Sequence, residues 1–85
     1  MSMVQELIAA VTNAERQIDD QIMKLRDYSG EIEKVTQRVD AAFRGSEKEF
    51  GQQMVQQLSL TKTQVNDTLT RLQAAKDKLI QVRMI

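Results

Sequence analysis

The side chains that most often perform chemistry in proteins are those of histidine and cysteine, and this chain of 85 residues contains neither. General acid–base catalysis near neutral pH would therefore need a carboxylate in a desolvated pocket, and a serine nucleophile would need a base beside it. Di-metal centres in helical bundles use Glu-x-x-His pairs, whose histidine half is missing. Neither phosphate-binding motif, G-x-x-x-x-G-K-S/T or G-x-G-x-x-G, occurs. We therefore expect no enzyme activity, no cofactor and no bound metal.

The balance of charge limits the kind of partner. Twelve basic and twelve acidic residues give a formal net charge of zero, which disfavours binding to nucleic acid or to an anionic membrane surface. No apolar run is long enough to span a bilayer, and the N-terminus lacks the basic segment and apolar core of a signal peptide. We expect a protein partner, no membrane insertion, and a cytoplasmic location before any export, which would proceed without a cleaved signal peptide.

A turn is predicted at residues 41–50, whose sequence is AAFRGSEKEF. Gly45 can adopt the left-handed conformation that ends a helix, and Arg44 places a cation at the negative end of that helix. Ser46 and Glu49 have the S-x-x-E spacing of a capping box, which predicts a helix cap at the start of the next helix. Because these stop and start signals lie so close together, they predict a tight hairpin turn.

The predicted fold is all-α, with two long antiparallel helices forming a helical hairpin. Proline, the strongest helix breaker, is absent from the whole chain. Gly30 lies inside the first helix, either as a tolerated surface glycine or as a point where a neighbour packs closely. The predicted organisation is a single domain of residues 1–85, with helix 1 at about 3–43, a turn at 44–46 and helix 2 at about 47–82.

Apolar residues recur at every seventh position in both halves, as in helices that keep contact along their length. In the first half the main row is Val4, Val11, Ile18, Leu25, Ile32 and Val39, and a second row three residues on holds Leu7, Ala14, Gln21, Tyr28, Val35 and Ala42. In the second half the main row is Met54, Leu58, Val65, Leu72 and Leu79, with Thr61, Thr68, Ala75 and Val82 alongside.

Further apolar residues widen each stripe beyond what one neighbouring helix covers. They are Ile8, Ile22, Phe43, Phe50, Val55 and Leu69, while Leu60 is an apolar residue that lies off the stripe. A fold of this size without disulfides or metal is usually completed by association, which predicts a four-helix or larger bundle formed with a copy of itself or a related helical chain. The predicted bundle interface is Val11, Ile18, Ile22, Leu25, Ile32, Val39, Phe50, Met54, Leu58, Val65, Leu69, Leu72 and Leu79.

The turn resembles the W-x-G turn of the small Esx-type proteins of type VII secretion, with Phe43 in place of the tryptophan and Gly45 in place of the glycine. The small size, the central position of the motif and the proline-free flanking helices are also similar. Two features depart from that family. Phe43 lacks the indole N–H, and no Y-x-x-x-D/E export signal follows the second helix, because the only tyrosine is Tyr28.

This resemblance implies either a secreted substrate or a small escort that binds the helical N-terminal domain of an LXG-type toxin, with the secretion ATPase as a further partner. It also implies a recognition turn formed by Phe43, Arg44 and Gly45. The alternative is a structural coiled-coil adaptor or assembly subunit with no export role, since any helical hairpin needs a glycine-like stop and an apolar residue at the open end of its core. The sequence leaves open whether the partner is a second copy or another protein.

Overall fold

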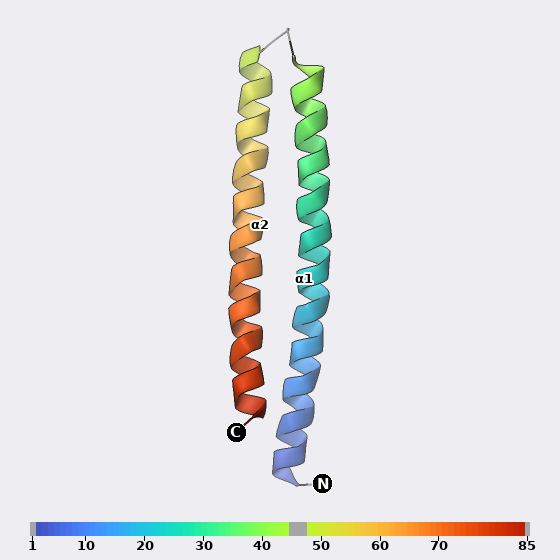
Figure 1. The fold of residues 1–85 in the computed structure, drawn as a ribbon, viewed down its shortest axis with the longest axis vertical. Coiled ribbons are helices and arrows are strands. Elements are labelled where there is room, and N and C mark those ends of the chain that lie inside the picture. The colour runs from blue at the N-terminus through green and yellow to red at the C-terminus, as the bar shows by residue number, and fades with distance from the viewer. Residues whose placement is uncertain (1, 45–47, 85) are drawn as a thin grey trace.

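Two long antiparallel helices lie side by side in the computed structural model, which describes residues 2–44 and 48–84 apart from the side chain of Lys48 (Figure 1). Helix α1 spans Met3–Ala42 and helix α2 spans Lys48–Arg83. The molecule is a rod with extents of 67 × 14 × 12 Å. The predicted all-α helical hairpin is therefore confirmed.

Helix α1 begins with a complete capping box. The Ser2 hydroxyl accepts the Gln5 N–H at 3.2 Å, and the Gln5 side-chain oxygen accepts the Ser2 N–H at 3.3 Å. At the other end, the Phe43 N–H donates to the Val39 carbonyl at 3.1 Å, which satisfies one of the last free carbonyls. The predicted caps Gly45 and Ser46 lie outside the described residues, so the second capping box stays a prediction.

Along each helix, the residues that contact the other helix are separated alternately by four and by three positions. The main rows agree with the sequence prediction from Val11 on in α1 and from Leu58 on in α2, but Val4 is exposed and Gly51 takes the place predicted for Met54. The companion row in each helix lies four residues after the main row instead of three. In α1 the buried and half-buried positions of these rows are Val11, Glu15, Ile18, Ile22, Leu25, Ser29, Ile32, Thr36, Val39 and Phe43. In α2 they are Gly51, Val55, Leu58, Lys62, Val65, Leu69, Leu72, Lys76 and Leu79.

The composition of α2 explains this choice of companion row. Both candidate rows hold two large apolar residues, Val55 and Leu69 four residues on and Met54 and Val82 three residues on. The four-on row also supplies Lys62 and Lys76, which pair with Glu33 and Asp19 of α1, whereas the three-on row adds threonines and an alanine, which bury less surface. Thr61 and Thr68 instead donate their hydroxyl hydrogens to carbonyls one turn back, at 3.0 Å in both cases. The predicted second rows are consequently turned away from the neighbouring helix. Tyr28 and Val35 are 52% and 41% exposed.

The apolar core is thin, because each helix has only one neighbour. Among the described residues, the buried apolar side chains are Val11, Ile22, Ile32 and Val65. Gly30 has nothing within 4 Å of the position that a Cβ would occupy, so it is a surface glycine and not a point of close packing. The first two turns of α1 extend past the end of α2, which leaves Met3, Val4, Leu7 and Ile8 exposed (Figure 1).

Candidate protein-interaction surfaces

The turn end of the hairpin is closed by an aromatic pair. Phe43 is half-buried and meets the ring of Phe50 edge-to-face, with the ring centroids 5.5 Å apart and an interplanar angle of 62°. Phe50 is 53% exposed, so it covers Phe43 from the solvent side. Of the three predicted recognition residues, Phe43 therefore packs within the hairpin, Arg44 is exposed, and Gly45 lies outside the described part of the chain.

Gly51 is a residue that sequence reasoning missed. It is buried, and a Cβ built on it would lie 2.6 Å from the Cβ of Phe43, a separation that side-chain carbons do not tolerate. The glycine therefore makes room for the phenylalanine. Its position was the available signal: it falls seven residues before Leu58, at the first place in the main row of α2, where an apolar side chain would otherwise stand.

A small open hollow of about 360 Å³ lies beside the aromatic pair. The Arg44 guanidinium and the Asp40 carboxylate meet at 3.3 Å on its rim, and both side chains are well exposed, so this ion pair adds little stability. The hollow is lined by Asp40, Phe43, Arg44, Gly51, Gln52, Val55 and Gln56.

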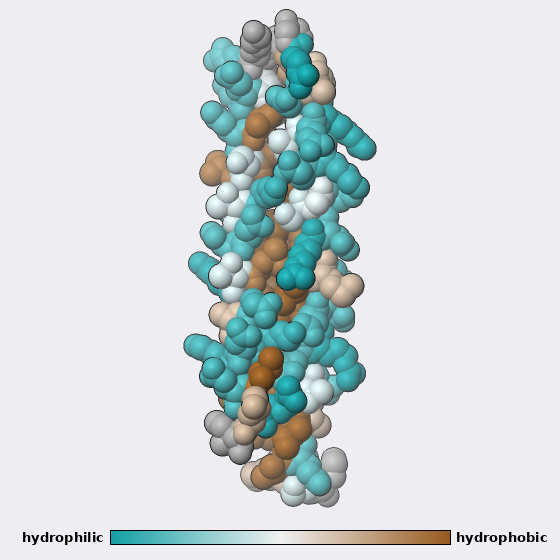
Figure 2. All heavy atoms as spheres, in the orientation of Figure 1, coloured by the Kyte–Doolittle hydropathy of each residue, from teal (hydrophilic) through white to brown (hydrophobic). Residues whose placement is uncertain are grey.

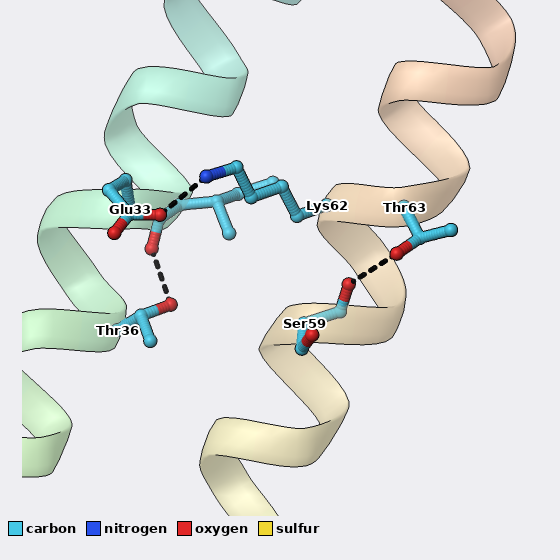
Figure 3. Close-up of polar contacts among 6 residues, drawn as sticks. Glu33, Thr36, Ser59, Lys62 and Thr63 are labelled. Atoms are coloured by element: carbon cyan, nitrogen blue, oxygen red, sulfur yellow. Dashed lines mark hydrogen bonds and ion pairs between the residues drawn. The ribbon is translucent and has the colours of Figure 1, made fainter.

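One broad side of the hairpin carries three ion pairs between the helices. Each takes its acid from α1 and its base from α2, and we call this side the ion-pair face. Lys62 pairs with Glu33, as Figure 3 shows, and Figure 2 shows a broad face on which hydrophilic side chains flank a hydrophobic stripe between the helices. The other two pairs are Lys76–Asp19 at 2.6 Å and Arg83–Glu15 at 2.9 Å.

Helical geometry places the predicted second rows on the opposite broad side. With about 100° between successive residues, a residue four positions on lies roughly 40° to one side of the main row, and a residue three positions on lies roughly 60° to the other side. Because the two helices are antiparallel and face each other, their three-on rows fall on the same side of the hairpin. We call this side the open face; its members are Ala14, Gln21, Tyr28, Val35 and Ala42 from α1 and Met54, Thr61, Thr68, Ala75 and Val82 from α2.

The open face is apolar but incompletely covered. Tyr28, Val35 and Val82 are exposed, and the main-row residues beneath them, such as Leu25 and Leu72, are only half-buried. Alanines and threonines occupy much of the remainder, so that another helix could approach closely. No ion pair among the described residues crosses between the helices on this side.

The predicted bundle interface divides into two parts. Met54 is a half-buried member of the open face, and Phe50 is exposed at the turn. The other predicted residues lie on the contact between α1 and α2, so their first role is to hold the hairpin together. These are Val11, Ile18, Ile22, Leu25, Ile32, Val39, Leu58, Val65, Leu69, Leu72 and Leu79.

Within residues 2–44 and 48–84, no group of three or more acidic side chains is placed to hold a metal ion. Within these residues, neither helix contains an apolar segment that is long enough to cross a membrane. Comparisons with protein families, with curated proteins and with solved structures gave no match. The geometry of the hairpin is therefore the basis for a functional proposal.

Proposed function

We propose that this protein is an interaction module whose hairpin completes a helical bundle with another helical chain. The observation that carries the proposal is the open face, where apolar side chains from both helices remain exposed next to half-buried main-row residues. Exposed apolar stripes of this kind mark interaction sites. In a four-helix bundle a second pair of helices would cover this side, so that each helix would be buried on two sides instead of one.

The finer proposal is an Esx-like role in type VII secretion, as a secreted substrate or as an escort of an LXG-type toxin. It is supported by the sequence of the turn, with Phe43 and Arg44 followed by Gly45 between two long helices without proline. A specific observation favours the second candidate, a structural adaptor or assembly subunit. Phe43 packs against Phe50 and Gly51, which is the contact expected of a residue that only closes the end of the hairpin.

The interaction module is tested with a double variant of the open face, Tyr28→Glu/Val35→Glu, in the tagged full-length chain expressed in its native host. The matched control is Met23→Glu/Gln37→Glu, which places the same charges at exposed positions on the outer side of α1. We expect the wild type and the control to be recovered in an assembly containing more than one chain, as measured by light scattering. The open-face variant should be recovered alone with its helical circular dichroism unchanged.

A wild-type chain that is folded, strictly monomeric at micromolar concentration and recovered without a companion would contradict the proposal. An open-face variant that still assembles would contradict the assignment of the interface to this side. Genes for an LXG-type toxin or a secretion ATPase beside that of this protein would favour the secretion role over the adaptor role.

A further inference from the structure

Basic side chains border the open face on both edges. The row next to it in each helix, six positions after the main row, contains Lys24 and Arg38 in α1 and Arg71 and Lys78 in α2. The one acidic residue among the described members of these rows is Glu31, and its carboxylate is paired with Lys34 at 3.4 Å. None of the four basic side chains pairs with a described acidic residue. In the two rows that border the open face, four basic residues therefore outnumber one acidic residue; Asp20, one turn before Lys24, lines the same hollow as Lys24.

The ion pairs show which of these residues lie level with one another. Opposite residues have numbers that add to 95, as in Glu33–Lys62 and Asp19–Lys76. Lys24 and Arg71 are therefore level, one on each edge, with the open face between them. They also lie within about one helical turn of the midpoint of the hairpin. Arg38 lies nearer the turn, and Lys78 lies nearer the chain ends.

This position disfavours a second copy as the occupant of the open face. An antiparallel two-fold arrangement centred on the open face places Lys24 level with Ile32 of the other copy, next to Glu31. In a parallel arrangement, or in an antiparallel one that overlaps the full length of the rods, the middle of one hairpin lies on the middle of the other. Lys24 and Arg71 of one copy would then face the same basic side chains of its partner, and like charges opposed across an interface are unfavourable. Acidic side chains at those places would instead form the flanking ion pairs that are common beside the contact stripe of helical bundles.

The size of the open face is sufficient for a specific complex. Its α1 row runs from Ala14 to Ala42, about 42 Å at 1.5 Å per residue, and two helices side by side are about 20 Å wide. The resulting area of roughly 800 Å² is what each partner contributes to a protein–protein interface of standard size.

We propose that the open face binds a helical pair of a different protein, whose apolar stripe is flanked by aspartate and glutamate. This inference rests on the proposed bundle-forming function and adds the chemistry of the partner. Positive edges on this chain select an acidic partner and discriminate against self-association, while the alanines and threonines between them allow close helix packing.

A charge-reversed variant of this chain can serve as a partner with acidic edges. The variant Lys24→Glu/Arg71→Glu keeps the apolar side chains of the open face and makes the middle of both edges acidic. Mixed with the wild type, it should form a complex of two chains, with a dissociation constant at least about tenfold lower than that of either protein alone. Raising the salt concentration from 50 to 500 mM should weaken this complex, because the flanking pairs are exposed. Sedimentation velocity with one chain fluorescently labelled measures both effects.

The matched control is Arg16→Glu/Arg26→Glu, which makes the same change in net charge at positions away from the open face. Mixing it with the wild type should give no more association than the wild type shows alone. If the wild type associates with itself as tightly as with the Lys24→Glu/Arg71→Glu variant, a second copy is the occupant and this inference is overturned, although bundle formation stands. If the mixture does not associate at all, the inference is also overturned, and recovery of the assembly from cells decides the proposed function separately.

Discussion

The two broad sides of the hairpin are built from the same helices but meet different requirements. On the ion-pair face, acids of α1 meet bases of α2, and Val55 and Leu69 pack into the contact beside them. On the open face, Tyr28 and Val35 are exposed and the bordering basic side chains have no described acidic partner. The hairpin pairs its charges across the helices on one side and leaves apolar side chains exposed on the other.

The largest difference is expected when the same negative charge is placed either in the contact between the helices or on the open face. Ile32→Asp buries an unpaired carboxylate and should lower the free energy of unfolding by several kcal/mol, on the order of 3–5. Val35→Asp, three residues on, should change it by less than about 0.5 kcal/mol while abolishing association. Thermal unfolding followed by circular dichroism, together with sedimentation, measures both effects. Equal destabilisation by the two substitutions would mean that Val35 belongs to the contact between the helices and that the open face is not a free surface.

Replacing each of two glycines by alanine should change the stability of the hairpin in opposite directions. Gly51→Ala introduces a Cβ against Phe43 and should destabilise the hairpin by about 1–3 kcal/mol. Gly30→Ala meets nothing within 4 Å and should stabilise it by about 0.5–1 kcal/mol through the higher helix propensity of alanine. Denaturant unfolding measures both changes. A neutral Gly51→Ala would show that the turn end repacks without cost.

The fold could be predicted from the sequence because the seven-residue repeat survives in both halves and the turn signals lie between them. The companion row could not, since in α1 the three-on row with Tyr28 and Val35 looks as apolar as the four-on row with Ile22 and Phe43. The larger side chains of α2 decide between them, and that information is not local to α1. Gly51 was missed for a related reason, because its role is defined by Phe43, which follows the end of α1.

The turn can be tested for a role beyond structure with its two phenylalanines. Phe43→Ala removes a half-buried ring and should cost about 1–2 kcal/mol, and Phe50→Ala, which removes an exposed ring, should cost less. If the turn is a recognition element of secretion, Phe43→Ala should reduce export or toxin co-secretion severely in cells where the variant remains helical. Export that follows stability alone, in the same order for both variants, would favour the structural adaptor.

The smallest effect concerns the ion-pair face itself. A double-mutant cycle with Lys76→Ala and Asp19→Ala should give a coupling energy of about 0.5 kcal/mol, because the pair joins two helices but is partly exposed. The same cycle on Lys34 and Glu31, which are three residues apart in one helix, should give about 0.3 kcal/mol. Salt should reduce both couplings. Removing Lys76 or Asp19 should not affect association, because both lie on the ion-pair face. A loss of partner binding on removing Lys76 would therefore show that the ion-pair face takes part in assembly, and the division between the two faces would fail.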